Sequence, residues 1–141
     1  MQTTIQIATA AGKMLSQGYH CSEAVYWAGT QLYPEKVSPE LHKFATPFAG
    51  GVGNTCDGLC GALSGGILVI GALYGRLDNE ADDKLCQDLA AKYYREFKKA
   101  FKHVICHEIK EDWRKEFGYD NCENLVREAI LILANILEKM S

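Results

Sequence analysis

Residues 58–75 read GLCGALSGGILVIGALYG, a stretch of 18 residues without a charged side chain. This length is at the lower edge of what a membrane-spanning helix requires. Six of the residues are glycine, however, and no basic cluster flanks the stretch. We therefore expect a buried central helix rather than a membrane span. Gly61 and Gly65 stand four residues apart, a spacing that permits close approach by a neighbouring segment.

Helical periodicity continues on both sides of this stretch. The expected helices run from Thr3 to Gln17 with Gly18 as a cap, from Ser22, from Ser38-Pro39, from the acidic residues 78–83, and from Cys122 to Met140. The fourth of these carries apolar residues at steps of four: Leu85, Leu89, Tyr93, Phe97 and Phe101. No alternating strand pattern appears. The sequence predicts an all-α fold, a single domain over residues 1–141 built as a bundle of five or six helices around the buried glycine-rich helix.

The last expected helix is apolar on every side over residues 129–134. Such a helix must be covered all round. Either the rest of the bundle or a second copy of the chain can supply that cover. A homodimer is therefore one of the expectations.

Charge and composition narrow the class of protein. The chain has 15 Lys and Arg against 18 Asp and Glu, a formal net charge of −3, which argues against nucleic-acid binding. Residues 1–8 have neither a cationic start nor an apolar run of signal-peptide length, so we expect a cytoplasmic protein. Thiols stay reduced there, and six cysteines in 141 residues then indicate metal or redox chemistry.

Motifs for two common cofactors are missing. Residues 50–53, Gly-Gly-Val-Gly, lack the spacing of a phosphate-binding loop and are expected to form a loop that leads into the central helix. Cys106-His107 lacks the second cysteine of a haem-attachment motif. We therefore expect neither a nucleotide nor a haem.

The cysteines stand at positions 21, 56, 60, 86, 106 and 122, and no Cys-x-x-Cys motif occurs. If the central helix begins near Cys56, then Cys56 and Cys60 face the same side of it. Cys21, Cys60 and Cys122 lie at or near expected helix starts, where the helix dipole lowers a thiol pKa and stabilises the thiolate. Cys86 lies near the apolar side of its helix, and packing is the preferred explanation for it.

The motif Cys-Gly-Ala-x-x-Gly at residues 60–65 is preceded by Cys21 in Cys-Ser-Glu-Ala-Val and followed by Cys106 and Cys122. This arrangement resembles the C_GCAxxG_C_C family of redox-active proteins over nearly the whole chain. The resemblance implies that the family cysteines are Cys21, Cys60, Cys106 and Cys122. Some members carry selenocysteine, and a related module occurs in split-Soret cytochromes, where an iron–sulfur centre accompanies the haems. The haem-binding part of those cytochromes has no counterpart here.

Two chemical hypotheses follow. In the first, which we favour at this point, the four family cysteines, with Cys56 as a further candidate, bind an iron–sulfur cluster or, alternatively, zinc for electron transfer or sensing. Gly58, Gly61 and Gly65 would then let the backbone approach the cofactor.

In the second hypothesis the chain is a thiol–disulfide oxidoreductase in which Cys60 is the attacking thiol. A cysteine pair across one helical turn has poor geometry for a disulfide, so Cys21, Cys106 or Cys122 is a better partner than Cys56. Both hypotheses require a redox partner protein that the sequence does not identify. A structural or partner-binding helical module is the third alternative, and it leaves four cysteines unexplained.

Overall fold

The computed structural model of the chain describes residues 2–117 and 122–140. These residues form α1 (Thr4–Lys13), η1 (Met14–Gln17), α2 (Cys21–Leu32), η2 (Pro39–Phe48), α3 (Gly61–Tyr74), α4 (Lys84–Phe101), α5 (Cys106–Phe117) and α6 (Glu123–Glu138), where η denotes a 3₁₀-helix. The prediction of an all-α bundle around a buried glycine-rich helix is confirmed. That residues 1–141 are one domain stays a prediction.

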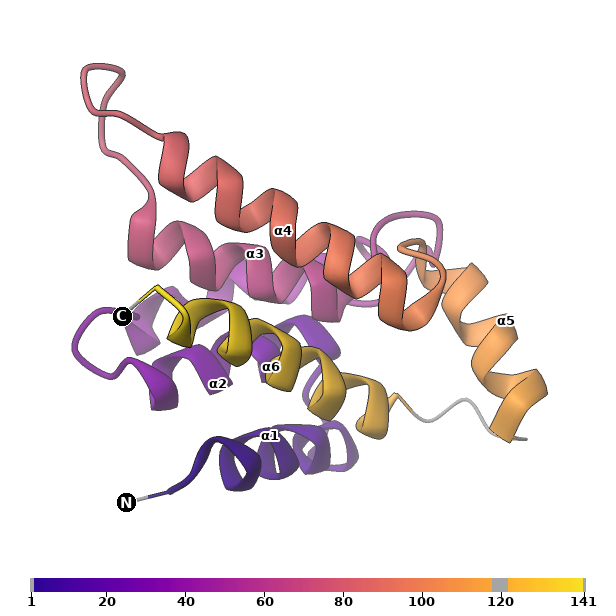
Figure 1. Cartoon of the computed structure of the whole chain (residues 1–141). Helices are drawn as coiled ribbons and strands as arrows, with labels where there is room; N and C mark the ends of the chain where they lie inside the picture. The colour runs from indigo at the N-terminus through magenta and orange to yellow at the C-terminus, as the bar shows by residue number, and fades with distance from the viewer. Residues whose placement is uncertain (1, 118–121, 141) are drawn as a thin grey trace.

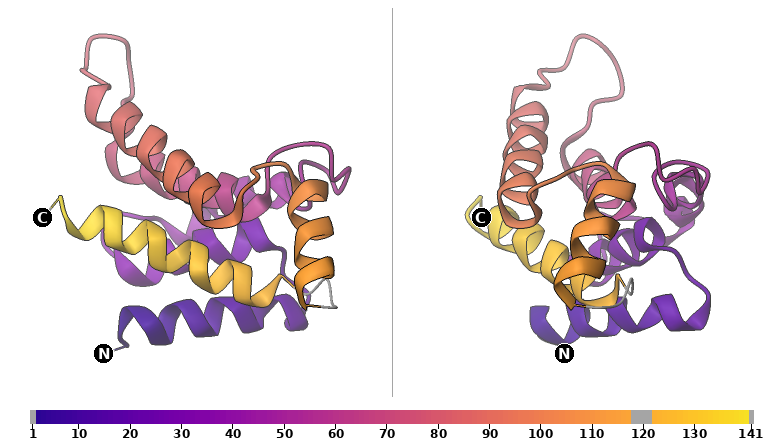
Figure 2. Two further views of the ribbon diagram at one scale, coloured as in Figure 1. Left: turned by 45° about the vertical axis from the view of Figure 1, so that its right-hand side comes forward. Right: turned by 90° about the vertical axis from the view of Figure 1, so that its right-hand side faces the viewer.

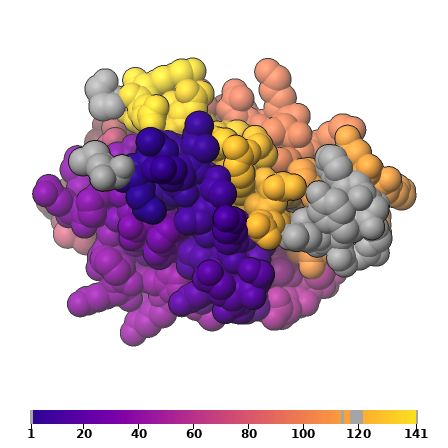
Figure 3. All heavy atoms as spheres, turned by 90° about the horizontal axis from the view of Figure 1, so that it is seen from below, coloured from indigo at the N-terminus to yellow at the C-terminus, as the bar shows by residue number. Residues whose placement is uncertain are grey.

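The long helices lie in layers, with α5 across one end of them. Helix α1 lies along α6 at one side of the molecule, α2 packs against α3, and α4 covers the opposite side of α3 (Figure 1). Figure 3 shows α1 and α6 next to each other at the surface. Helix α5 is steeply inclined to α4 and α6, and the loop between α3 and α4 extends away from the bundle (Figure 2). The starts of α2, α3, α5 and α6 thereby come to the same end of the molecule.

Glycine allows α3 to lie close against α2. A Cβ added at Gly65 would stand 2.6 Å from the carbonyl oxygen of Ser22 and 3.1 Å from Cβ of Val25. In the other direction, Gly29 of α2 receives the side chain of Val69 of α3. Close approach at the Gly61 and Gly65 pair was expected from their spacing, and it is confirmed.

Aromatic side chains join α3, α4 and α5. Tyr93 is fully buried against Gly66, where a Cβ would overlap its ring, and its hydroxyl donates to the carbonyl oxygen of Ala62 at 3.0 Å. Phe97 and Phe101 follow at one-turn intervals with ring centroids 4.7 Å apart, and Phe101 meets Trp113 of α5 at 6.2 Å. Edge-to-face pairs at such distances are favourable. This row fixes the position of α5, which carries part of the site described below.

Two expected helix starts are wrong. Helix α3 begins at Gly61 rather than Gly58, so Cys56 lies in the preceding loop and not on the helix. The acidic residues 78–83 form a loop before α4, because Asp82 accepts the N–H of Lys84 at 2.8 Å and caps the helix from outside. Residues 39–48 form a 3₁₀-helix that begins at Ser38 and Pro39 as expected.

Leu85, expected on the buried side of α4, is 42% exposed. Helix α5 was not predicted.

The rest of the bundle covers most of the apolar stretch in α6. Ala129, Ile130 and Leu133 are fully buried, and Leu131 and Ile132 pack partly buried against the core. The intrachain alternative therefore accounts for the burial of this stretch, and the homodimer stays a prediction. Within the described residues, no helix is both long and apolar enough to cross a bilayer.

Candidate functional site

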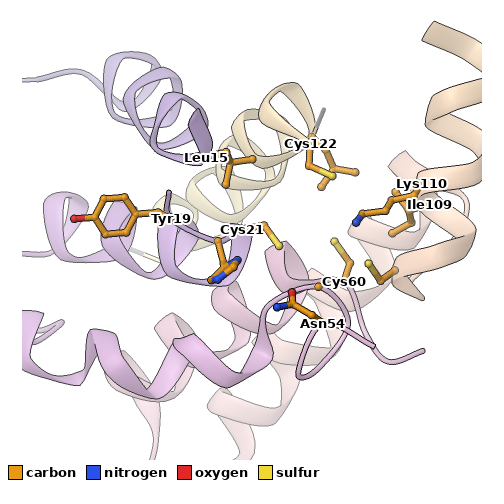
Figure 4. Close-up of a pocket in the computed structure, with 12 residues that line it drawn as sticks. Leu15, Tyr19, Cys21, Asn54, Cys60, Ile109, Lys110 and Cys122 are labelled. Atoms are coloured by element: carbon orange, nitrogen blue, oxygen red, sulfur yellow. The ribbon is translucent and has the colours of Figure 1, made fainter. Parts of the chain in front are cut away.

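Four cysteines line one cavity of about 300 Å³ at the end of the bundle where α5 lies. Cys21 is the first residue of α2, Cys60 precedes the first residue of α3, Cys106 is the first residue of α5, and Cys122 precedes the first residue of α6. The other lining residues are Leu15, Tyr19, His20, Gly50, Asn54, Ile109, Lys110 and Leu125. Figure 4 shows the sulfurs of Cys21, Cys60 and Cys122 and the amine of Lys110 directed towards the same space. The structure thus brings the four family cysteines to one cavity.

Cys21 and Cys60 are paired thiols, each of which shifts the pKa of the other. The hydrogen bond from Cys60 lowers the pKa of Cys21 to about 6 against the desolvation of the site, and the backbone N–H groups of Gly50 and Ser22 and the charge of Lys110 act in the same direction. The same hydrogen bond, burial and the charge of Cys21 raise the pKa of Cys60. Cys21 is therefore the thiolate of the pair, although the sequence-based hypothesis gave the low pKa to Cys60.

The solvent exposure of the two thiols agrees with Cys21 as the thiolate and Cys60 as the protonated thiol. Cys21 is partly exposed, whereas Cys60 is only 6% exposed. The thiol that ionises first is therefore also the more accessible of the two.

The three glycines expected at a cofactor instead contact other protein segments. A Cβ at Gly61 would overlap Sγ of Cys21 and come within 3.1 Å of the backbone nitrogen of Ser22. A Cβ at Gly58 would stand 2.8 Å from the carbonyl oxygen of Gly51, and Gly65 lies against α2 as described above. Gly61 thus gives Cys21 the space to approach Cys60. A role for these glycines at a cofactor stays a prediction.

The loop before α3 is a left-handed turn. Gly50, Gly51, Val52, Gly53 and Asn54 all have φ between 53° and 72°. Val52 has the most strained backbone conformation of the five, because side chains with a branched Cβ rarely adopt positive φ. The turn is closed by hydrogen bonds that include Cys56 N–H to Gly50 at 2.8 Å. It positions the Gly50 N–H at Cys21, so the expected loop at residues 50–53 has a definite role in the site.

A short antiparallel strap joins the end of this loop to the start of α5. Cys60 N–H donates to Val104 at 2.8 Å, Cys106 N–H to Gly58 at 2.9 Å, and His107 N–H to Cys56 at 3.0 Å. The strap places Cys56 beside Cys106, where the thiol of Cys56 contributes to the raised pKa of Cys106. Burial raises the pKa of Cys106 to about 12, which the charge of Lys110 opposes.

Lys110 is the residue that the sequence analysis missed. Its Nζ lies 4.0 Å from Sγ of Cys56 and is partly buried. Desolvation lowers the pKa of Lys110, but electrostatic interactions with Cys106, Cys56, Cys122 and Cys21 together raise it above its ordinary value. The ammonium therefore stays charged among the thiols. Its position four residues after Cys106, on the same side of a helix, could have indicated it had α5 been predicted.

The remaining two cysteines differ in position. Cys122 interacts electrostatically with Cys60 and Lys110 from the start of α6. Cys86 does not line the cavity and packs partly buried against the core, in agreement with the packing explanation.

Thiolates are suitable donors for iron–sulfur clusters and zinc. In residues 2–117 and 122–140, however, no three His, Cys, Asp or Glu side chains are arranged to hold a metal ion together. The donor chemistry fits such a centre, but the arrangement of the described donors does not. The assignment of Cys21, Cys60, Cys106, Cys122 and Cys56 as metal ligands stays a prediction.

Comparison with known proteins identifies one relationship. A family model described as "Putative redox-active protein (C_GCAxxG_C_C)" matches residues 19–136. The match includes all six cysteines and Lys110. No curated protein and no solved structure matches the chain.

Proposed function

The chain belongs to the C_GCAxxG_C_C family of redox-active proteins, and within it we propose a thiol–disulfide oxidoreductase in which Cys21 attacks and Cys60 resolves. The position of Cys21 and Cys60 at one cavity, where Gly61 leaves room for the Cys21 sulfur beside Cys60, carries this proposal. Thiol exchange requires one thiolate that a substrate can reach and a second thiol within reach of the first. The partly exposed Cys21 and the buried Cys60 supply these two groups.

The reaction begins when the Cys21 thiolate attacks one sulfur of a substrate disulfide. A bond forms between Cys21 Sγ and that sulfur, the substrate S–S bond breaks, and the second substrate sulfur leaves as a thiolate. Cys60 then loses its proton and attacks Cys21 Sγ. This step forms the Cys21–Cys60 disulfide and releases the first substrate sulfur as a thiolate. The substrate has gained two electrons, and protons from Cys60 and solvent complete its two thiols.

Local groups stabilise the charge that this reaction uses. The N–H groups of Gly50 and Ser22 hydrogen-bond the Cys21 sulfur, and the Lys110 ammonium acts on it through the cavity. Hydrogen bonds to a thiolate favour the reduced, charged form. The Cys21–Cys60 disulfide is therefore a good acceptor of electrons from a dithiol partner, and the Cys21 thiolate is the form that attacks a substrate disulfide.

The test uses the aromatic disulfide 5,5′-dithiobis(2-nitrobenzoate) with a chain in which Cys56 and Cys106 are replaced by serine. We expect a fast phase that releases two equivalents of thionitrobenzoate and leaves a Cys21–Cys60 disulfide on peptide mapping. Adding Cys60→Ser should reduce the fast phase to one equivalent and trap the nitrobenzoate group on Cys21. Adding Cys21→Ser should abolish the fast phase.

Cys86→Ser is the matched control, because Cys86 lies outside the cavity, and it should leave the fast phase unchanged. Urea unfolding of each variant verifies that it is folded. A fast phase that survives Cys21→Ser in a folded protein would contradict the proposal. So would a disulfide that joins Cys21 to Cys122 instead of Cys60.

A metal or iron–sulfur centre for electron transfer or sensing is the second candidate function. It is favoured by the convergence of four cysteines from four helix starts on one cavity, since helix starts and backbone N–H groups stabilise thiolate ligands. Cys21, Cys60, Cys106 and Cys122 would be the ligands, with Cys56 as a further candidate. Because no three described donors are arranged for a metal ion, their side chains would have to rearrange on binding.

The second candidate is tested on protein purified without oxygen. Visible absorption with matching iron and acid-labile sulfide, lost in Cys60→Ala, would favour a cluster. Stoichiometric zinc without colour, lost in the same variant, would favour a zinc site. Metal-free protein with a reactive Cys21–Cys60 pair would contradict both and leave thiol exchange.

A further inference from the structure

The backbone holds Cys56 and Cys106 against each other. Cys106 N–H donates to Gly58 at 2.9 Å, and His107 N–H donates to Cys56 at 3.0 Å, so the two chain segments run side by side. A Cβ added at Gly51 would stand 2.7 Å from Cβ of Cys106 and 2.9 Å from Cα of Cys56. One small volume is therefore bordered by both cysteines, and only a glycine at position 51 leaves it open.

Lys110 lies beside the two thiols. Lys110 Nζ is 4.0 Å from Sγ of Cys56, and its charge acts on Cys106 as well. Cys56 is partly exposed, whereas Cys106 is 5% exposed. This arrangement repeats that of Cys21 and Cys60: an outer thiol, an inner thiol and a source of positive potential.

The inner member of this pair belongs to the same cavity as the first pair. Cys106 lines the cavity together with Cys21 and Cys60. Cys106 and Cys21 are near enough for the charge of one to act on the other. Cys56 does not line the cavity. Cys106 is therefore placed between the first pair and Cys56.

We infer that Cys56 and Cys106 form a second dithiol–disulfide couple, which takes over the disulfide formed by Cys21 and Cys60. The inference rests on the proposed function and extends it, since it gives the protein two redox couples in series. The first meets the substrate disulfide in the cavity. The second presents Cys56 to an external dithiol reductant.

The transfer consists of two exchanges. Cys106 loses its proton and attacks Cys21 Sγ, which forms a Cys21–Cys106 bond and breaks the Cys21–Cys60 bond, and Cys60 leaves as a thiolate and takes up a proton. Cys56 then loses its proton and attacks Cys106 Sγ, which forms the Cys56–Cys106 disulfide and releases Cys21 as a thiolate. Two electrons pass from the second pair to the first.

An external dithiol completes the cycle. It attacks the partly exposed Cys56 sulfur, reduces the Cys56–Cys106 disulfide and is itself oxidised to a disulfide. Hydrogen bonds from Gly50 and Ser22 stabilise the reduced form of the first pair through the Cys21 sulfur. A stabilised reduced form makes a disulfide a stronger oxidant, so the disulfide passes from the first pair to the second.

The test oxidises the reduced wild-type chain with one equivalent of 5,5′-dithiobis(2-nitrobenzoate). Samples are quenched with acid and an alkylating agent at successive times and mapped by peptide mass spectrometry. We expect the Cys21–Cys60 disulfide first and the Cys56–Cys106 disulfide later, with the total near one per chain. The rate of conversion should not depend on protein concentration, because the transfer is intramolecular.

Cysteine variants test the individual exchanges of this transfer. Cys106→Ser should leave the Cys21–Cys60 disulfide in place, Cys56→Ser should accumulate the Cys21–Cys106 disulfide, and Cys86→Ser should behave as wild type. A wild-type chain that forms the Cys21–Cys60 disulfide but never the Cys56–Cys106 disulfide overturns the inference and leaves the proposed function intact. So does a conversion rate that rises with protein concentration. If no Cys21–Cys60 disulfide forms in Cys106→Ser, where the transfer is blocked, the proposed function fails and the inference fails with it.

Discussion

The two thiol pairs differ in what holds them. Cys21 and Cys60 lie at the starts of two helices that pack closely through glycine, and backbone N–H groups meet the outer sulfur. Cys56 and Cys106 are held by three backbone hydrogen bonds between residues 56–60 and residues 104–107 at the start of α5. One pair is built into the core of the bundle, and the other is attached to its end.

This difference explains why the same residue type behaves differently at two neighbouring places. Hydrogen-bond donors lower the pKa of Cys21 to about 6, whereas burial raises the pKa of Cys106 to about 12. At neutral pH Cys21 is therefore a thiolate, whereas Cys60 and Cys106 in the same cavity keep their protons. Position relative to backbone N–H groups, more than the number of cysteines, decides which sulfur reacts first.

The largest expected effect is in thiol reactivity. At about pH 7, Cys21 should react with iodoacetamide roughly 100-fold faster than Cys106, because its larger thiolate fraction outweighs the lower intrinsic nucleophilicity of a low-pKa thiolate. Residue-resolved mass spectrometry of briefly labelled, reduced protein measures the ratio. Equal labelling of the two cysteines would remove the distinction between the pairs.

Packing at the first pair is tested by two glycines of α3. Gly61→Ala should destabilise the protein by about 1–3 kcal/mol, because the new Cβ overlaps Cys21 Sγ and forces the helices apart. Gly71→Ala is the control, since nothing lies within 4 Å of its added Cβ, and it should be neutral or stabilising by up to about 1 kcal/mol. Urea unfolding under reducing conditions measures both. Equal effects would mean that Gly61 does not set the spacing between α2 and α3.

Packing at the second pair is tested by two glycines of the left-handed turn. Gly51→Ala and Gly53→Ala both place a Cβ at positive φ, 72° and 61°, which costs about 1–2 kcal/mol in each case. Only Gly51 has neighbours, Cys106 and Cys56, so Gly51→Ala should cost about 1 kcal/mol more. It should also lower the yield of the Cys56–Cys106 disulfide. An unchanged yield with equal stabilities would show that the strap tolerates a wider spacing.

The dependence of stability on pH separates the pairs through their pKa values. Between about pH 6 and 9 the unfolded chain holds a proton at Cys21 that the folded chain has lost, so the free energy of unfolding rises with pH, by at most about 1.4 kcal/mol per pH unit. This contribution is lost as pH falls through 6. Above about pH 9 the raised pKa values of Cys60 and Cys106 act in the opposite direction, and stability should fall.

Urea unfolding of reduced protein at several pH values measures this profile. Cys21→Ser should remove the rise below about pH 9, and Cys106→Ser should reduce the fall above it. A rise that persists in Cys21→Ser would assign the low pKa to another group.

Much of the fold could be predicted because helix formation depends on local patterns. The uncharged stretch at residues 58–75 indicated a buried helix, and the apolar steps at Leu89, Tyr93 and Phe97 indicated the side of α4 that packs on it. Helix boundaries were less accurate. The acidic residues 78–83 suit a helix start, yet Asp82 caps α4 from outside it, and this choice depends on side-chain hydrogen bonds that periodicity does not reveal.

The sequence by itself determined the helical class, the glycine-rich central helix and, through the family motif, the four cysteines that line the cavity. Only the tertiary structure decided which thiols are neighbours: Cys21 with Cys60, and Cys56 with Cys106. It also decided that Lys110 lies among them. The physical reason is that thiol hydrogen bonds and pKa values depend on contacts of a few ångströms between segments distant in the chain. Helix packing, a left-handed turn and a backbone strap set those contacts, and none of them has a periodic signature.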